Sequence, residues 1–236
     1  MIQNISIFLP LRAGSARIPH KNTRPFHPNG QSLFEYKFAQ IEKIKGDVYE
    51  IVISTNDQEV IDQIPDRIRG TNIRLVIRPD ELCSATTKVQ DLINHVADVT
   101  SGDTIFWIHA TAPFLDSSDY KAAIKQYQEM ISNQTGDSLM SVNKIQQFIW
   151  NENDKRVINT DRSVNPWPNT QDLEPLYEIN HAFYINSREN YNELKDRIGK
   201  NPELYVCEGL KKIDIDWHDD FIVAQHLISL YENDTK

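Results

Sequence analysis

The sequence predicts an α/β fold in which helices flank a mostly parallel sheet. Short apolar runs, typical of buried strands, alternate with helical segments over residues 5–143, and a polar, proline-bearing segment then interrupts them at 144–176. Strands that alternate with helices favour a parallel sheet covered on both faces. The 236 residues suffice for one well-buried core and are too few for two domains of ordinary size. We therefore expect a single domain, 1–236, with 144–176 as a protruding insertion or dimerisation arm.

The expected elements follow in order along the chain. Ile5–Leu11 is an almost continuous apolar run that leads into a loop with glycine, serine and proline, and it predicts the first buried strand. Further strands are expected at Tyr49–Ser54, Ile73–Ile77, Thr104–His109, Ser138–Asn143, His181–Ile185 and Lys212–Asp216. Helices are expected at Ser32–Ile44, Gln58–Ile68, Thr87–Val99, Ser117–Ser132 and Asp219–Tyr231. Pro65 should end or distort the second of these helices.

Composition excludes several classes of partner. The chain has 25 basic and 34 acidic residues, a net charge of -9. A nucleic-acid or anionic-membrane surface would need a broad positive field instead. Ile5–Leu11 is too short to span a membrane and lacks the basic flank of a secretory signal. Cys83 and Cys207 lack the paired spacing of a zinc or thioredoxin-like site. We expect buried thiols, a cytoplasmic location, and no binding to nucleic acid or membrane.

Basic residues gather directly after the first strand. Residues 12–24 contain Arg12, Arg17, Lys21 and Arg24 and no acidic residue. A strand that ends in a small-residue turn leaves backbone N–H groups free to face phosphate oxygens, while Arg12 and Lys21 add compensating charge. The spacing is neither the Walker pattern nor GxGxxG, which disfavours a P-loop NTPase and a dinucleotide-binding dehydrogenase. The segment predicts a phosphate-binding loop, with an ordinary basic surface loop as the alternative.

Two carboxylates lie close together near the end of the chain, in Ile213-Asp214-Ile215-Asp216. Side chains alternate along an extended strand, so Asp214 and Asp216 should face the same side. Adjacent carboxylates repel unless a cation lies between them, and Mg²⁺ commonly takes one or two carboxylates together with water and substrate phosphates. The alternative is a pair of solvated carboxylates before an acidic helix start. The pattern predicts a Mg²⁺ site.

Taken together, six ordered motifs resemble those of the CMP-sialic acid synthetases, or acylneuraminate cytidylyltransferases. Leu9–Asn22 resembles the family's P-A-R-x-G-S-K-x-I-P-x-K-N. The other matches are Val52–Asp57 to V-S-T-D-D, Arg78–Leu82 to R-P-x-E-L, His109–Phe114 to Q-P-T-S-P-L, Asn180–Ile185 to N-G-A-x-Y-I, and Asp214–Asp216 to D-I-D. The resemblance implies a Rossmann-like nucleotidyltransferase sheet and transfer of CMP from CTP to the anomeric hydroxyl of an acidic nine-carbon keto sugar, with Mg²⁺ as cofactor and release of pyrophosphate.

The resemblance also implies roles for individual residues. The positions that would contact the triphosphate are Arg12, Ser15, Lys21 and Asn22. Those near cytosine would be Arg78 and, less directly, Thr86 and Thr87. His109, Asn180 and His181 fall where the family binds its acceptor sugar, and Asp214 and Asp216 where it binds Mg²⁺. Catalysis is expected from Arg12, Lys21 and the two aspartates, by positioning and by cancelling negative charge at the reacting phosphate. His109 is also a candidate general base, as is a metal-bound hydroxyl.

Three positions depart from the family motifs. Ala16 replaces a lysine, although Arg17 could return the charge, while His109 replaces a glutamine and His181 a glycine. Since the two histidines fall beside the acceptor, we expect a nonulosonic acid other than ordinary N-acetylneuraminate, such as legionaminic or pseudaminic acid. The alternatives are an enzyme for the eight-carbon acid KDO, one for another nucleotide or rare sugar, and a nucleotide-binding protein without turnover. We also expect a homodimer, with Trp150 and Trp167 in the core, the dimer contact or the sugar pocket.

Overall fold

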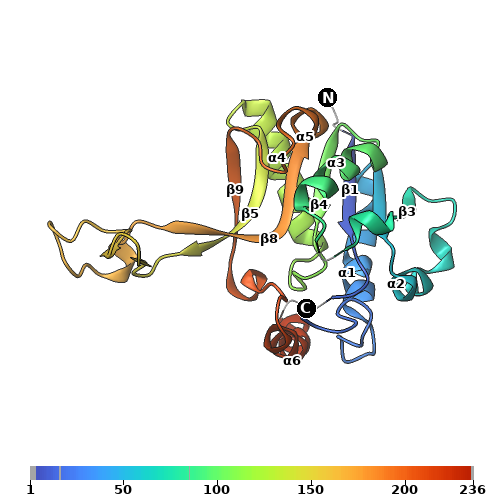
Figure 1. The fold of residues 1–236 in the computed structure, drawn as a ribbon, viewed down its shortest axis with the longest axis horizontal. Helices are drawn as coiled ribbons and strands as arrows, with labels where there is room; N and C mark the ends of the chain where they lie inside the picture. Colours follow the sequence, from blue (N-terminus) through green and yellow to red (C-terminus); the bar gives the residue numbers. More distant parts are fainter. Residues whose placement is uncertain (1–3, 16, 85, 235–236) are drawn as a thin grey trace.

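One seven-stranded sheet organises the part of the chain that the computed structural model describes, residues 4–15, 17–84 and 86–234 (Figure 1). Its strand order is β3-β2-β1-β4-β8-β5-β9. The strands are β1 (Ile5–Pro10), β2 (Glu50–Thr55), β3 (Ile73–Ile77), β4 (Thr104–Ile108), β5 (Ser138–Ile145), β8 (Leu176–Ser187) and β9 (Pro202–Cys207). Four of the six neighbouring pairs are parallel, and β8 runs antiparallel to both β4 and β5. The predicted mostly parallel α/β sheet is therefore confirmed.

Helices cover both faces of this sheet. They are α1 (Leu33–Glu42), α2 (Gln58–Gln63), α3 (Val89–Val99), α4 (Ser117–Asn133), α5 (Arg188–Leu194) and α6 (His218–Asp234). Short 3-10 turns occur at Lys45–Asp47, Asp66–Ile68, Asp80–Leu82, Thr170–Asp172 and Gly209–Lys212. Helices α1 and α4 share one core cluster with the strands, and α3 and α5 share another on the opposite face. None of the helices among the described residues is long and apolar enough to cross a bilayer.

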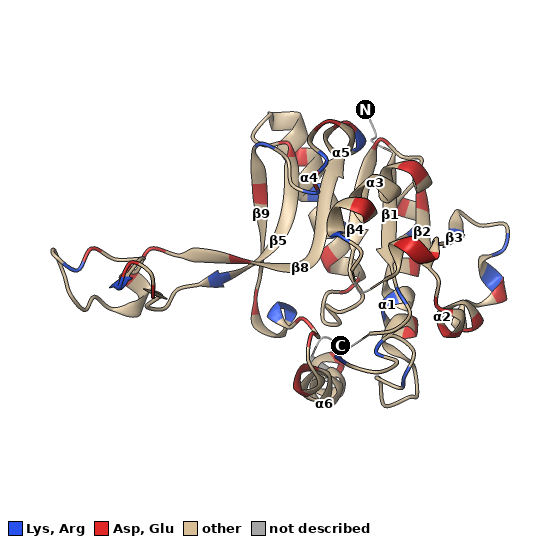
Figure 2. Ribbon diagram, in the orientation of Figure 1, with Lys and Arg blue, Asp and Glu red and all other residues tan. Residues whose placement is uncertain are grey.

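Local sequence explains where several helices begin and end. Helix α1 begins after Ser32, which accepts from the Glu35 backbone N–H while the Glu35 carboxylate accepts from the Ser32 N–H. The predicted helix Gln58–Ile68 is divided at Pro65 into α2 and a 3-10 turn, as proline's missing N–H requires. Charged side chains of both signs are dispersed over the ribbon (Figure 2). On this acidic chain, the predicted phosphate loop is a local basic segment.

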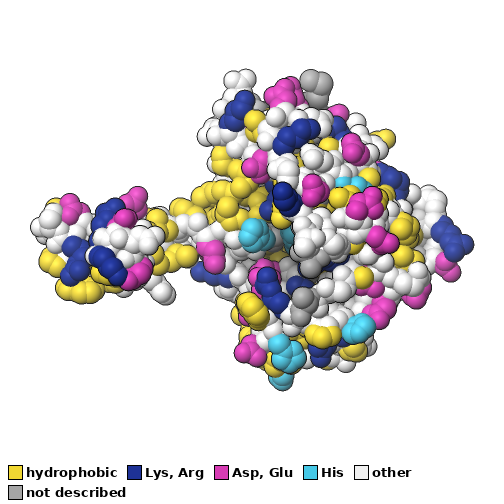
Figure 3. All heavy atoms as spheres, in the orientation of Figure 1, with side chains coloured by type: hydrophobic (Ala, Val, Ile, Leu, Met, Phe, Trp, Pro, Cys, Tyr) yellow, Lys and Arg dark blue, Asp and Glu magenta, His cyan; other side chains and the backbone are white. Residues whose placement is uncertain are grey.

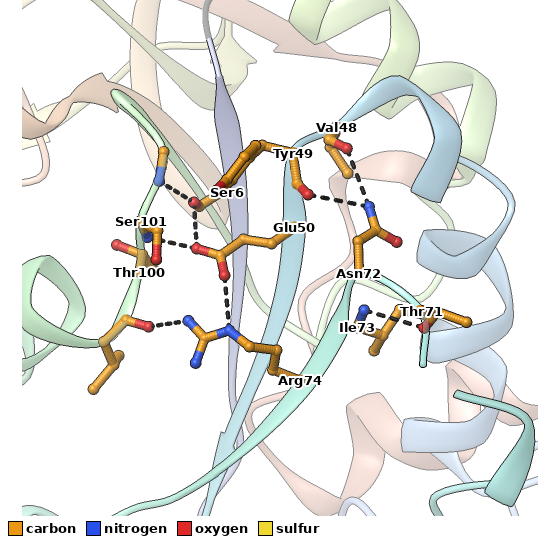
Figure 4. A network of polar contacts seen from close by, with 12 residues as sticks. Ser6, Val48, Tyr49, Glu50, Thr71, Asn72, Ile73, Arg74, Thr100 and Ser101 are labelled. Atoms are coloured by element: carbon orange, nitrogen blue, oxygen red, sulfur yellow. Dashed lines mark hydrogen bonds and ion pairs between the residues drawn. The ribbon is translucent and has the colours of Figure 1, made fainter. Parts of the chain in front are cut away.

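A buried polar network joins the amino-terminal ends of β1, β2 and β3 (Figure 4). Glu50 accepts from the Ser6 hydroxyl at 2.7 Å and from the Arg74 Nε at 2.8 Å. The Ser6 hydroxyl oxygen also accepts from the Gly102 N–H at 2.7 Å, where a Cβ on Gly102 would lie 2.3 Å from the Asn4 carbonyl oxygen. Burial would raise the pKa of Glu50, but these donors hold it below its ordinary value. The network thus fixes the strands at the end opposite the predicted phosphate loop.

The insertion projects from the sheet as a long arm (Figure 1). Its base is the paired ribbon of β5 and β8, in which Ile145 lies opposite Leu176. Farther out lies a small hairpin of β6 (Trp150–Asn151) and β7 (Arg156–Val157). Trp150 and Trp167 are 52% and 68% exposed, so neither fills the core. The predicted protrusion is confirmed, while its part in a dimer stays a prediction.

Three sequence predictions need correction. Lys212–Asp216 is not a strand, because a 3-10 turn takes up Gly209–Lys212 and the next residues lie outside the sheet. The predicted strand His181–Ile185 is the inner part of the 12-residue β8, whose first half is mostly exposed or half-buried in the ribbon. Strand β9 was missed because it lies at the sheet edge, is mostly half-buried, and shows no clear apolar alternation. The thiols of Cys83 and Cys207 are buried and unpaired, as predicted.

Candidate active site

A cavity of about 290 Å³ opens where β1 and β4 end. In parallel sheets, the loops at the carboxyl ends of strands are the usual place for ligands. Its lining residues are Pro10, Leu11, Arg12, Ser15, Arg17, Lys21, Asn22, Arg78, Leu92, His109, Ala110, Thr111 and Asp216. Basic, acidic and histidine side chains gather near the middle of the face shown in Figure 3. The cavity therefore brings together residues from the first, third, fourth and sixth sequence motifs.

The predicted phosphate loop forms one wall of this cavity. The turn begins with Ala13, whose N–H donates to Asn56 Oδ1 at 3.1 Å, and continues through Gly14 with φ 71°. A positive φ favours glycine, which lacks a Cβ. Lys21 reaches across the cavity and donates from Nζ to the carbonyl oxygen of Ile215 at 2.8 Å. Burial lowers the pKa of Lys21, against the opposing effect of Asp214 and Asp216. Ala16 lies outside the described residues.

The two predicted metal ligands flank Ile215, which is fully buried. The Ile215 N–H donates to the Thr111 carbonyl oxygen at 2.9 Å, and this bond ties the segment to the loop after β4. Asp216 is exposed, and its Oδ2 pairs with Arg17 Nη1 at 3.0 Å. The buried Oδ1 of Asp214 has no hydrogen-bond partner in the described part of the chain. Burial raises the pKa of Asp214, a side-chain hydrogen bond with Thr111 opposes this rise, and the charge of Asp216 adds to it.

The donor set near these aspartates limits which metal the site could hold. No group of three or more histidine, cysteine or acidic side chains is arranged for a metal among the described residues. A two-carboxylate site suits Mg²⁺, which retains waters and substrate oxygens, better than a metal that requires a complete protein cage. The unpartnered buried oxygen of Asp214 fits such an ion. The residues present are therefore compatible with Mg²⁺.

The residues predicted to lie near cytosine divide into two groups. Arg78 is buried, lines the cavity, and donates to the Ser54 carbonyl oxygen at 2.5 Å. Thr86 and Thr87 do not line it, because their hydroxyls lie 3.0 and 2.9 Å from the Ser84 hydroxyl. Arg12 donates to the carbonyl oxygen of the same Ser84 at 3.2 Å. The two threonines and Arg12 therefore contact the same residue, Ser84, although only Arg12 of the three lines the cavity.

On the predicted acceptor side, His109 is the residue that lines the cavity. Its ring stacks on Trp107 with centroids 5.9 Å apart, and its buried Nε2 has no partner among the described residues. Burial, with the nearby charges of Arg197, His181 and Lys21, lowers the pKa of His109 to about 3. The imidazole is therefore neutral near pH 7 and a weak base, which favours hydrogen bonding over general-base chemistry.

Asn180 and His181 do not line the cavity. Asn180 is buried, donates to Asn143 Oδ1 at 2.8 Å and accepts from the Ala182 N–H at 3.2 Å, so its amide is used within the sheet. His181 is exposed, with Nδ1 2.6 Å from the Tyr184 hydroxyl. Its φ of 57° is in the left-handed region, where the resembled family carries glycine. That backbone geometry explains the family's residue better than pocket volume does.

Sequence reasoning missed one residue that positions the cavity wall. Lys37 of α1 is fully buried and donates to the carbonyl oxygens of Ala112 and Leu115 at 2.6 and 2.7 Å. A third contact, 2.7 Å long, reaches the Tyr120 hydroxyl. These bonds hold the loop that follows Thr111. The available signal was a lysine on the apolar face of a helix, since a buried lysine needs partners.

Comparisons with known proteins agree with this geometry. Residues 7–233 match the family model described as cytidylyltransferase. An N-acylneuraminate cytidylyltransferase of Escherichia coli O18:K1:H7 is 24% identical, covering 99% of this chain and 56% of that protein. A pseudaminic acid cytidylyltransferase of Campylobacter jejuni serotype O:23/36 is 27% identical, covering 96% of each. The chain spans about half the length of the N-acylneuraminate cytidylyltransferases it matches.

Solved structures share the fold at low sequence identity. A CMP:2-keto-3-deoxy-manno-octonic acid synthetase complexed with CTP has a TM-score of 0.64 and 16% identity, covering 96% of this chain and 99% of that one. A 4-diphosphocytidyl-2C-methyl-D-erythritol synthase from Anaerococcus prevotii has a TM-score of 0.65 and 13% identity, covering 97% and 100%. These likenesses support the Rossmann-like nucleotidyltransferase fold.

Proposed function

The chain belongs to the cytidylyltransferase family, of the CMP-sialic acid synthetase type, and on that premise we propose that it transfers CMP from CTP to an acidic nine-carbon keto sugar. Pyrophosphate is the second product. The observation that supports this most directly is the 2.8 Å contact between Lys21 Nζ and the Ile215 carbonyl oxygen. It brings the basic loop against the two carboxylates. Lys21 and the proposed metal ligands can therefore bind the same triphosphate.

The reaction is an in-line displacement at the α-phosphorus of CTP. The anomeric hydroxyl oxygen of the sugar forms the new P–O bond and its proton passes to solvent water, while the bond to the bridging oxygen breaks and pyrophosphate leaves with the electron pair. Lys21 and Arg12 hold the triphosphate and offset the negative charge that grows on its oxygens. Ser15 and Asn22, which line the same wall, are proposed to donate hydrogen bonds to the phosphates.

We further propose that Asp214 and Asp216 hold Mg²⁺. The support is chemical: a buried carboxylate oxygen without a partner lies beside a second, exposed carboxylate. When bound, Mg²⁺ would supply positive charge to the phosphate oxygens. The aspartates also act on the protein's own cation, because their charges oppose the lowering of the Lys21 pKa. They thereby help to keep this lysine protonated.

The acceptor is proposed to be a nonulosonic acid other than ordinary N-acetylneuraminate, with legionaminic and pseudaminic acids as candidates. His109 supports this, because a neutral ring in the cavity wall offers different hydrogen bonds from an amide. Arg78 is proposed to lie beside cytosine, with Thr86 and Thr87 close by. Asn180 and His181 are proposed to shape the acceptor side through the backbone of β8. A homodimer joined by the arm and a cytoplasmic location complete the proposal; the latter suits two unpaired buried thiols.

Pyrophosphate release with each of the four nucleoside triphosphates tests the proposal. The acceptor panel is N-acetylneuraminic, legionaminic, pseudaminic and KDO acids, each assayed with Mg²⁺. We expect release that needs both CTP and a nonulosonic acid, with N-acetylneuraminate a poor acceptor. Preference for another nucleotide, or for KDO, would replace the proposed substrate pair. A clear preference for N-acetylneuraminate would show that His109 does not select the sugar as proposed.

A further inference from the structure

The guanidinium of Arg197 lies over two aromatic rings, one of which also stacks with His109 of the cavity wall. Its guanidinium carbon lies 4.3 Å from the ring centroid of Tyr184 and 5.1 Å from that of Trp107. Both rings are buried, and their residues are register partners on β8 and β4. Stacking on aromatic faces orients a guanidinium while its N–H edge stays available for hydrogen bonds. The side chain is therefore held in place without using its donors.

The Trp107 ring relates Arg197 to the cavity, because it packs against both Arg197 and His109. His109 stacks on Trp107, the same ring that carries Arg197, and it lines the cavity. The charges of Arg197 and Lys21 both act on the imidazole of His109. His109 therefore lies within electrostatic reach of the phosphate-side lysine and of Arg197. Arg197 does not itself line the cavity, and its link to the cavity is the Trp107 ring that it shares with His109.

The four cations that line the cavity among the described residues are already engaged by the protein. Arg12 donates to Ser84, Arg17 pairs with Asp216, Lys21 donates to Ile215 and Arg78 donates to Ser54. The guanidinium of Arg197 makes no hydrogen bond or ion pair with any residue in the described ranges, and the residue is only half-buried. Five N–H donors in a planar fork match the paired oxygens of an oxyanion such as a carboxylate or a phosphate. An anion is the missing partner.

We propose that Arg197 is a specificity-determining residue that binds the carboxylate of the acceptor sugar. The inference rests on the proposed function, in which the acceptor is a keto acid whose carboxylate is bonded to the same carbon as the attacking hydroxyl. Binding that carboxylate fixes the orientation of the hydroxyl, and it separates acid sugars from neutral ones. Arg197 acts by binding alone and exchanges no proton with the substrate.

Two variants and a control test this role. Arg197→Met keeps an unbranched stem over the rings and removes the charge and donors, while Arg197→Lys keeps the charge and removes the fork. Lys200→Met removes an exposed cation from the same loop and serves as the control. Each protein is assayed with pseudaminic and N-acetylneuraminic acids and with their C1 carboxamides, with KM for CTP and Tm measured in parallel.

We expect the wild type to prefer acid over carboxamide by about tenfold or more in kcat/KM, as a lost charge-assisted bond predicts. Arg197→Met should abolish this preference and raise KM for the acid while KM for CTP stays unchanged. Arg197→Lys should keep part of the preference, and Lys200→Met all of it. Wild-type preference in Arg197→Met would overturn the inference and leave the proposed function standing.

Failure of the proposed function has a different signature, namely no pyrophosphate release by the wild type with either acid. Arg197 can then be judged by calorimetric titration of each acid and carboxamide into the CTP-bound protein without added metal. The inference is supported if the wild type binds an acid more tightly than its carboxamide and Arg197→Met binds the two equally. Equal binding of acid and carboxamide by the wild type overturns it.

Discussion

The ammonium group of Lys21 lies 2.8 Å from the backbone carbonyl oxygen of Ile215, the residue between Asp214 and Asp216. The contact joins two motifs that are 194 residues apart in the chain. Since the charges of both aspartates act on this lysine, cation and carboxylates form a single electrostatic unit. Substituting any one of the three should change the behaviour of the other two, so their effects on activity should not add.

Substituting either carboxylate should remove most activity without unfolding the protein. Asp214→Asn and Asp216→Asn should each lower the rate of pyrophosphate release at least about tenfold, equal to about 1.4 kcal/mol of transition-state stabilisation. Tm should fall little, because Asp214 Oδ1 lacks a partner in the described chain and the Asp216 pair with Arg17 is exposed. Asp219→Asn, which changes an exposed carboxylate in the first turn of α6, is the control. A near wild-type rate at saturating Mg²⁺ would place the metal elsewhere.

The two cations of the phosphate loop should affect triphosphate binding and the chemical step together. Lys21→Ala and Arg12→Ala should each raise KM for CTP and lower kcat, because both charges face developing negative charge. Arg24→Ala tests whether any cation of the loop has this effect, since Arg24 does not line the cavity and stacks on Phe221. Thermal melts accompany the kinetics. Unfolding of both cavity variants at ordinary temperature would show that the loop is structural instead.

Stability should rise with pH above neutrality because of Lys37. Burial lowers the pKa of Lys37 to about 7, from 10.5 for a solvated lysine. Between these values the unfolded chain binds more protons than the folded one, so the free energy of unfolding increases as pH rises. Below about pH 7 both states are protonated and this contribution is constant. Urea unfolding from pH 6 to pH 9 should show the rise for the wild type relative to Lys37→Met.

Lys37→Met should also be less stable at every pH, by about 2–4 kcal/mol, since two buried carbonyl oxygens lose their donor. Lys43→Met, which changes an exposed lysine at the end of the same helix, should reproduce the wild-type curve. Parallel pH curves for the wild type and Lys37→Met would mean that the lysine does not lose its proton on folding in this range.

The arm should mediate dimerisation. Trp150 and Trp167 expose large apolar surfaces on a protrusion that packs little against the core, and such surface is commonly covered by a partner. Light scattering at micromolar concentration should therefore give twice the chain mass of 27.4 kDa. Trp150→Ser should shift the population toward monomer, whereas Trp217→Ser, an exposed tryptophan away from the arm, should not. Monomers with full activity would contradict the proposed dimer.

The gathering of the predicted phosphate loop and other motif residues at one cavity could be predicted because the signals are local. A buried strand followed by a small-residue turn and basic side chains defines where phosphate can bind, and parallel strands end at one edge. For this reason Arg12, Lys21, Arg78 and His109 line one cavity. Ile215 is buried between a half-buried Asp214 and an exposed Asp216, although this segment lies outside the sheet.

Other features depend on contacts that no local pattern encodes. Asn180 matches a motif, yet its amide bonds to Asn143 within the sheet, because β8 pairs with β5 along its length. Arg197 belongs to none of the sequence motifs. Its position depends on the rings of Trp107 and Tyr184, which lie on strands that are distant in sequence. The antiparallel direction of β8 is likewise a property of the assembled sheet. Such features follow from tertiary packing, which overrides local preference.

The position of β8 between β4 and β5 also sets the order in which the sheet can assemble during synthesis. Residues up to 108 contain β1 to β4, so this half-sheet can pair early on the ribosome. Strand β5 must wait, because both of its sheet neighbours, β8 and β9, come later in the chain. The carboxylates that meet Lys21 emerge later still. A nascent chain that stops before residue 176 would thus expose half a sheet, with the predicted phosphate loop but without the aspartates whose charges act on Lys21.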